Sequence, residues 1–228
     1  MPITTCVFDA YGTLFDVTAA ARAAAAEPGY EGFAGAWEKV AADWRTKQLQ
    51  YTWLRAITDE HDDFWRVTQD ALDWALEAAG QDGDPHLRER LLDLYWELEA
   101  FPEVPDMLAR LKDGGMVTAI LSNGSPPMLK GAVDSGGIGG LLDEVLSVES
   151  VGIYKPASAV YSLVRNRFGC ERDEVLFVSS NGWDASAAAG FGFETAWVNR
   201  AGLPQERLPH APAHTIDDLS GIPALAGL

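Results

Sequence analysis

The sequence has few basic residues, only two cysteines and no long apolar run, and each shortage excludes a class of protein. Its 228 residues include 17 Lys and Arg against 34 Asp and Glu, a formal net charge of −17. This charge argues against nucleic acid and against an anionic membrane surface as partners. The apolar runs are strand-sized, so we expect no membrane span, and no basic segment followed by an apolar core marks an export signal.

The two cysteines, Cys6 and Cys170, have no second Cys or His nearby at metal-ligand spacing. Cys6 lies inside an apolar segment and is most simply a small buried residue. The sequence therefore predicts a protein of the reducing cytoplasm.

Apolar residues, by contrast, are abundant at 47%, which predicts a packed core. Residues 3–8 are typical of a buried strand that ends at Asp9. Residues 15–100 are typical of helices, with patterns at 17–27, from Phe33 to Trp44, at 62–79 and at 86–99. Six of the eight tryptophans lie in this helical block, where we expect them in contacts between helices.

From residue 105 onward, helical and strand patterns alternate. We expect helices at 105–113, 127–135, 157–168 and 184–190, and strands at 117–121, 144–148, 175–178 and 194–198. This alternation predicts an α/β fold with a doubly wound, Rossmann-like parallel sheet. We expect residues 1–14 and 101–228 to form this core, and residues 15–100 to form a helical cap inserted after the first strand. The tail, 201–228, reads as surface wrapping with a weak strand around 214–216.

Polar residues follow the predicted strands. Asp9 follows the first strand, Ser122 and Asn123 the second, and residues 179–184 a later one, while Lys155 lies at a strand-to-helix junction. The carboxyl ends of parallel strands meet at one edge of a sheet, so these side chains should converge. Each polar residue alone could be a helix cap. Several in register, with a Lys and two Asp among them, favour a functional site.

These residues resemble the four motifs of the haloacid dehalogenase superfamily, across essentially the whole chain. Phosphatases of that superfamily carry a second Asp, a general acid, where this chain has Tyr11. A halide leaves as an anion and needs no such acid. The segment 179–184 has one acidic residue, where a magnesium-dependent phosphatase usually shows two. Few hard ligands for Mg²⁺ remain, so we expect no metal and no other cofactor.

Further segments, at 8–16, 44–55, 101–104 and 154–161, are similar to L-2-haloacid dehalogenases. This resemblance implies hydrolysis of L-2-haloalkanoic acids to D-2-hydroxy acids, with inversion at C2, through an aspartyl ester on Asp9. The catalytic residues that it implies are Asp9, Thr13, Arg45, Ser122, Lys155, Tyr161, Ser179, Asn181 and Asp184. The substrate-binding residues that it implies are Tyr11, Arg45, Leu49, Phe64, Ser122, Asn123, Lys155 and Trp183.

The resemblance gives each catalytic residue a role that is physically sensible. Asp9 would attack C2, oriented by Thr13, and covalent catalysis would divide one hard displacement into two steps. Arg45 would bind the departing halide, and Ser122 the substrate carboxylate. Lys155 would offset the negative charge of two carboxylates and an anionic substrate.

In the second step, Asp184 would position or deprotonate the attacking water. Asn181 and Ser179 would orient Asp184 and Lys155, with Tyr161 as a further partner. The apolar pocket around C2 and the halide would consist of Tyr11, Leu49, Phe64 and Trp183. Two cations in a closed site of low dielectric would outweigh the diffuse repulsion from the acidic surface.

Plainer interpretations remain open. Arg45 could be a solvated helix arginine, and Phe64 and Tyr161 could be ordinary core residues. The chain as a whole could be a superfamily phosphatase with altered metal motifs, or a non-catalytic scaffold on the same fold. The resemblance also implies a homodimer formed through the cap helices.

Overall fold

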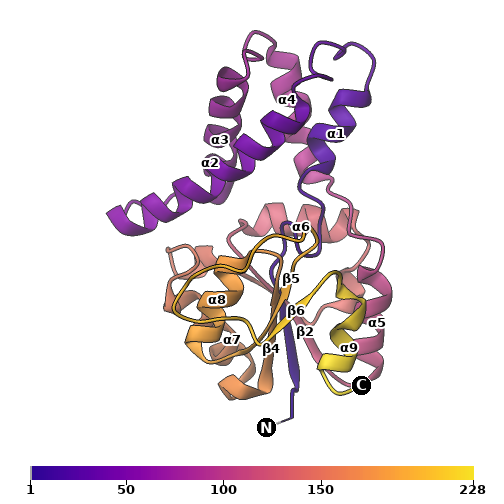
Figure 1. Ribbon diagram of the computed structural model, residues 1–228, viewed down its shortest axis with the longest axis vertical. Coiled ribbons are helices and arrows are strands. Elements are labelled where there is room, and N and C mark those ends of the chain that lie inside the picture. Colours follow the sequence, from indigo (N-terminus) through magenta and orange to yellow (C-terminus); the bar gives the residue numbers. More distant parts are fainter. Residues whose placement is uncertain (1) are drawn as a thin grey trace.

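Residues 2–228, the part of the chain that the computed structural model describes, form a six-stranded sheet with the order β3-β2-β1-β4-β5-β6 (Figure 1). All neighbouring strands pair in parallel. This order is that of a doubly wound sheet, so the predicted Rossmann-like core is confirmed. The strands are β1 (Thr5–Phe8), β2 (Val117–Ser122), β3 (Glu144–Ser147), β4 (Val175–Ser179), β5 (Glu194–Val198) and β6 (His214–Ile216).

The central strands are buried along their whole length. Every residue of β1 and of β4 is buried. A parallel sheet has helices on both faces, and its strands are therefore continuous apolar runs rather than alternating ones. In Figure 1, α7 and α8 flank the sheet on one side, and α5 and α9 on the other. The helices of this layer are α5 (Val104–Asp113), α6 (Pro126–Ser135), α7 (Ser158–Phe168), α8 (Gly182–Phe191) and α9 (Ile222–Leu225).

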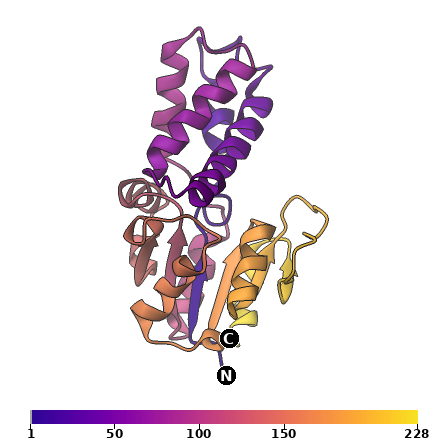
Figure 2. The ribbon, with the colours of Figure 1, turned by 90° about the vertical axis from the view of Figure 1, so that its left-hand side faces the viewer.

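A second layer, made of helices alone, lies above the carboxyl ends of the strands (Figures 1 and 2). Its helices come from the sequence between β1 and α5. Asp63 and Asp84 accept backbone N–H bonds at the starts of two of them, as helix-capping residues do. The layer consists of α1 (Ala19–Ala26), α2 (Trp37–Thr58), α3 (Phe64–Ala78) and α4 (Pro85–Trp96).

Two details differ from the sequence patterns. The apolar period of the second helix begins at Phe33, but α2 begins at Trp37, because Phe33 is buried from a preceding turn. The strand predicted around 214–216 is confirmed as β6, but the tail does more than wrap the surface, since β6 extends the sheet beyond β5 and α9 follows it. Among the described residues, the longest and most apolar helices still fall short of what a membrane crossing requires.

Candidate active site

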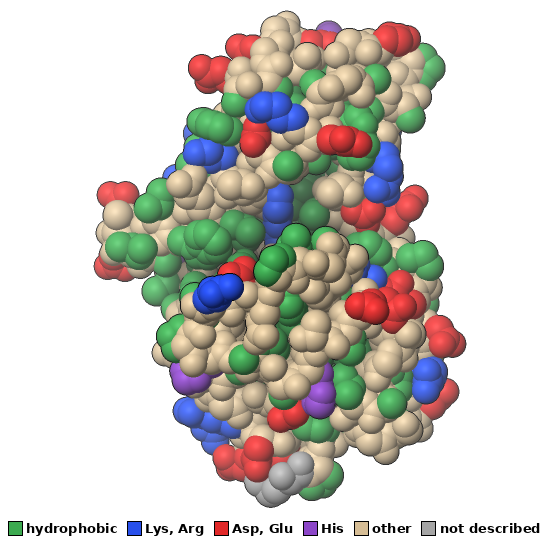
Figure 3. Space-filling view, in the orientation of Figure 1, with side chains coloured by type: hydrophobic (Ala, Val, Ile, Leu, Met, Phe, Trp, Pro, Cys, Tyr) green, Lys and Arg blue, Asp and Glu red, His purple; other side chains and the backbone are tan. Residues whose placement is uncertain are grey.

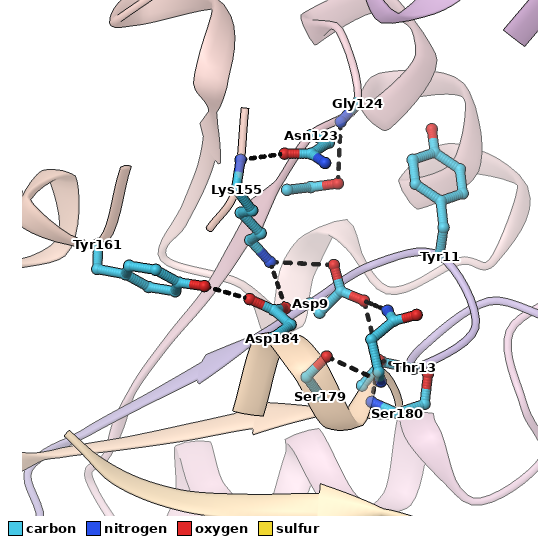
Figure 4. A network of polar contacts seen from close by, with 12 residues as sticks. Asp9, Tyr11, Thr13, Asn123, Gly124, Lys155, Tyr161, Ser179, Ser180 and Asp184 are labelled. Atoms are coloured by element: carbon cyan, nitrogen blue, oxygen red, sulfur yellow. Dashed lines mark hydrogen bonds and ion pairs between the residues drawn. The ribbon is translucent and has the colours of Figure 1, made fainter. Parts of the chain in front are cut away.

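The central carboxylate of the candidate site belongs to Asp9, which directly follows β1. Its side chain is 8% exposed, and its backbone N–H donates to the carbonyl of Val178. Three groups bind the carboxylate (Figure 4). The Nζ of Lys155 lies 3.1 Å from Oδ1, while Thr13 Oγ1, at 3.1 Å, and Asn181 Nδ2, at 2.9 Å, both donate to Oδ2. Asp9 is thus a buried anion with one cation and two neutral donors.

The turn after Asp9 brings Thr13 to its partners. The hydroxyl of Thr13 accepts the backbone N–H of Ser180 at 2.8 Å, and its own proton has two acceptors at 3.1 Å, Asp9 Oδ2 and Ser180 Oγ. Gly12 makes this turn at φ +88°, a conformation that residues with a Cβ rarely adopt. A Cβ there would also lie 3.0 Å from the Oγ of Ser180.

Lys155, on the connection from β3 to α7, bridges two carboxylates. Its ammonium lies 3.1 Å from Asp9 and 2.8 Å from Asp184, and both of these side chains are buried. The other oxygen of Asp184 accepts the hydroxyl of Tyr161 at 2.6 Å. The backbone N–H of Lys155 donates to the side-chain oxygen of Asn123 at 2.9 Å, which fixes the connection against the end of β2.

Burial and charge act together on this network. Burial disfavours the ammonium of Lys155, but the carboxylates of Asp184 and Asp9 outweigh it, and the pKa of Lys155 is raised. Burial raises the pKa of Asp184 although Lys155 opposes the shift. Burial, together with Asp184, also raises the pKa of Tyr161 well above its ordinary value. Lys155 therefore stays a cation at neutral pH, and Asp184 is a stronger base than a surface aspartate.

Ser179 and Asn181 make different contacts from the expected ones. The amide of Asn181 donates to Asp9 rather than to Asp184. The hydroxyl of Ser179 accepts the backbone N–H of Asn181 at 3.1 Å, so its partner is Asn181 and not Lys155. Asn181 is the residue that precedes α8 and has an extended backbone, whereas Asp184 lies within the first turn of the helix. Asn181 is therefore not held on a helix face with Asp184.

Arg45 reaches the site from α2 in the upper layer. One guanidinium nitrogen donates to the carbonyl of Tyr11 at 3.1 Å and approaches the side-chain oxygen of Asn181 at 3.4 Å. The other donates to Gln48 at 3.0 Å. Gln48 is itself buried and bonds to Thr68 and Tyr95, so Arg45 is held toward the sheet rather than solvated.

Tyr11 stands in an aromatic environment. Its ring stacks on that of Tyr95, with 5.6 Å between centroids, and lies 6.1 Å from that of Phe64. Burial raises its pKa well above the ordinary value. Among residues 2–228, its hydroxyl is one of the buried polar atoms without a hydrogen-bond partner. Gly124 allows the close approach, because a Cβ there would lie 2.7 Å from the Tyr11 ring.

A small cavity joins these groups between the two layers. All eight residues predicted to bind substrate line it, together with Asp9 and Asn181. Thr13, Tyr161, Ser179 and Asp184 do not line the cavity; each bonds to Asp9, Lys155, Asn181 or another of these four. A larger, apolar groove lies beside the cavity and shares Trp183 with it, but no Asp, Glu, Lys or Arg lines that groove. The charged side chains of the candidate site therefore surround the smaller cavity and not the groove. Figure 3 shows apolar and basic side chains side by side where the two layers adjoin.

Sequence reasoning missed three residues that support the site, namely Ser180, Gln48 and Tyr95. A polar residue three positions after Arg45 on a helix was an available signal for Gln48. The stacking of Tyr95 on Tyr11 had no sequence signal. Among the described residues, no group of three or more His, Cys, Asp and Glu side chains is arranged to hold a metal ion.

Comparisons with known proteins match nearly the whole chain. Residues 3–192 match a family model described as haloacid dehalogenase-like hydrolase. The chain is 43% identical over 224 residues to (S)-2-haloacid dehalogenase 1 of Pseudomonas sp. (strain CBS-3), which covers 98% of this chain and 96% of that relative. A crystal structure of an L-2-haloacid dehalogenase is 41% identical, with a TM-score of 0.92 and full coverage of both chains. Another, from Xanthobacter autotrophicus with chloropropionic acid covalently bound, is 35% identical, with a TM-score of 0.87 and coverage of 99% and 98%.

Proposed function

This chain belongs to the haloacid dehalogenase-like hydrolases, in the family of the 2-haloacid dehalogenases, and we propose that it converts L-2-haloalkanoic acids to D-2-hydroxy acids. One observation carries the proposal. A buried carboxylate, Asp9, lies with two cations, Lys155 and Arg45, around a cavity walled by aromatic side chains. A small organic anion with an apolar substituent matches this lining.

In the first step, Asp9 attacks C2 of the substrate from the side opposite the halogen. The new bond joins a carboxylate oxygen to C2, and the halide leaves with the electron pair of the old bond. This displacement inverts C2. Arg45 is the cation available to the halide, and Ser122, with the adjacent backbone turn, is available to the substrate carboxylate. The Xanthobacter relative, described with chloropropionic acid covalently bound, supports an ester intermediate.

In the second step, water attacks the carbonyl carbon of the Asp9 ester. Asp184 takes the proton from this water, a role that its raised pKa favours. The tetrahedral intermediate collapses, and the D-2-hydroxy acid leaves with a proton returned from Asp184. The second proton of the water is released to solvent, so Asp9 is again a carboxylate. The bond between C2 and oxygen is not broken, so the inverted configuration persists.

We propose that this reaction needs no metal. The ammonium of Lys155 already lies between the two carboxylates that a divalent cation would have to join. A superfamily phosphatase, the main alternative, predicts hydrolysis of phosphate esters that depends on Mg²⁺. Dehalogenation that persists in a chelator, with no such phosphatase activity, excludes this alternative.

Residues 15–100 act, in this proposal, as a cap that closes the cavity, and residues 1–14 and 101–228 as the catalytic core. We propose that two copies associate through the cap helices. The exposed apolar side chains of Leu54, at 50%, and Ile57, at 80%, lie near the end of α2 and support such an interface. A cytoplasmic location stays a prediction, consistent with two unpaired cysteines.

The test measures halide release from L-2-chloropropionate and identifies the product enantiomer. We expect chloride and D-lactate in equal amounts. A single turnover with excess enzyme in ¹⁸O water tests the ester, because the label should enter Asp9 and not the lactate. No halide from chloro, bromo and fluoro acids would refute the function. A scaffold role is tested by Asp9→Asn, which should abolish turnover, and a cellular role that survives this change would favour the scaffold.

A further inference from the structure

The loop between α2 and α3, residues 59–63, contacts the sheet layer. This contact is separate from the two connections through which the chain passes between the layers. Figure 1 shows the carboxyl end of α2 projecting to one side, while the crossings lie beneath α1 and α4 on the other. Asp59 ends α2 in a left-handed conformation, at φ 58°. The chain then turns and enters α3 at Phe64.

Glu149 from the core binds this loop through both carboxylate oxygens. Its Oε2 lies 2.9 Å from Nε2 of His61, and its Oε1 accepts the backbone N–H of Phe64 at 3.3 Å. The ring of His61 also lies 4.7 Å from that of Tyr154, whose hydroxyl donates to the carbonyl of Asp62. Successive residues of the loop are thus attached to the core.

The start of α3 needs the bond from Glu149. The first N–H groups of a helix have no partner within it, and a carboxylate is favoured at that end. Asp63, the capping residue, takes the N–H of Trp65. The N–H of Phe64 goes to Glu149 instead, so a carboxylate from one layer fixes the first residue of a helix in the other.

Both ends of this attachment lie at the wall of the candidate cavity. The side chain of Phe64 is fully buried and lines the cavity. Glu149 donates its own N–H to the hydroxyl of Ser147, and that hydroxyl donates to the carbonyl of Gly124. Gly124 belongs to the turn with Ser122 and Asn123, two further lining residues. A short series of hydrogen bonds therefore joins Phe64, on one side of the cavity, to the turn that carries Ser122, on the other.

We propose that His61 and Glu149 form a clasp that sets the distance of Phe64 from Asp9, and so the fit of the substituent on C2. Arg45 also bridges the two layers, but it lines the cavity itself. The clasp lies outside the cavity and is independent of the ligand. His61 and Glu149 are positioning residues, and their role in turnover rests on the function proposed above.

The first test compares Glu149→Ala and Glu149→Gln in the full chain, with L-2-chloropropionate and L-2-chlorohexanoate as substrates. In Glu149→Ala we expect KM for chloropropionate to rise about tenfold, the factor that corresponds to about 1.4 kcal/mol. The value of kcat should change less than threefold, since the contacts of Asp9 and Lys155 remain. The ratio of kcat/KM for L-2-chlorohexanoate to that for L-2-chloropropionate should rise, because Phe64 is held less firmly against the cavity.

Glu149→Gln keeps an oxygen acceptor for the N–H of Phe64 and should restore most of the affinity. The matched control is Glu144→Ala, which removes a similarly exposed carboxylate whose ion pair with Arg167 stays within the core. This control should leave KM and substrate preference unchanged. His61→Ala retains the bond to Phe64 and should raise KM less than Glu149→Ala.

Hydrogen exchange of the backbone amides of residues 59–67 provides a readout that needs no turnover. We expect faster exchange in Glu149→Ala but not in Glu149→Gln or Glu144→Ala. Unchanged exchange and unchanged KM in Glu149→Ala would overturn the clasp, and so would equal losses in Glu149→Ala and Glu144→Ala. If the wild type releases no halide, the proposed function fails, while the exchange experiment still decides whether the clasp exists.

Discussion

Replacing Lys155 by methionine should destabilise the protein strongly, because it leaves two buried carboxylates without their cation. Methionine is close to lysine in length and apolar, so packing changes little. The side chains of Asp9 and Asp184 are 8% and 0% exposed, so bulk solvent compensates little for the lost ammonium. Removal of one partner from a buried ion pair costs about 3–5 kcal/mol. In a chain of this size each kcal/mol lowers Tm by about 2–4 °C, so we expect a fall of about 6–20 °C.

The assay is thermal unfolding followed by circular dichroism, with two further variants. Lys39→Met removes the exposed pair with Asp43 and should cost less than about 1 kcal/mol. The double variant Lys155→Met with Asp184→Asn should recover part of the stability, because it removes one uncompensated charge. A fall no larger than that of Lys39→Met, or a double variant less stable than Lys155→Met, would refute the reasoning.

The loss in Lys155→Met should also depend on pH in a definite direction. Burial raises the pKa of Asp184 in the folded protein, and removal of the ammonium takes away the main opposing effect. The folded variant then binds a proton more tightly than the unfolded chain does, so its stability rises as pH falls toward the carboxylate range. Its Tm deficit relative to the wild type should therefore be smaller at pH 5 than at pH 7, and an equal deficit at both would contradict this.

Three further predictions follow from the site and the cap. Asp184→Asn should allow the first step but block the second, giving one halide per enzyme and an enzyme heavier by the acyl group in mass spectrometry. The acidic limb of the pH profile for kcat should lie above pH 3.8, the ordinary Asp value, because Asp184 must be ionised to accept a proton from water. Ile57→Asp should shift sedimentation toward a monomer with the fold intact, whereas Glu60→Gln, a nearby polar change, should not.

The fold and much of the site were predictable from sequence because the signals were local. A continuous apolar run predicts a parallel strand wherever it lies in the chain, and the carboxyl ends of such strands meet at one edge. The same rule places Asp9, Ser122 and Asp184 at one edge of the sheet, where the structure has them. The position of Lys155 at a strand-to-helix junction likewise predicts that it lies at this edge.

The remaining contacts could not be predicted, because they depend on how the two layers rest on each other. Asn181, an extended residue just before α8, bonds to Asp9 rather than to Asp184. Glu149 and His61 lie 88 residues apart in the sequence, and neither belongs to a sequence motif that predicts their contact. Only the placement of the helical layer decides that they meet.

The balance of charges around the cavity explains both why residue 11 is a tyrosine and why we propose no metal ion. The cavity and its immediate support hold two carboxylates, Asp9 and Asp184, and two cations, Lys155 and Arg45. A second aspartate at position 11 would add a third carboxylate in a buried aromatic environment, where an unpaired charge is costly, and only a further cation could offset it. Tyr11 keeps the balance with an uncharged ring. Lys155 can then offset Asp9 and Asp184, and Arg45 stays available to the departing halide, although the protein as a whole has a charge of −17.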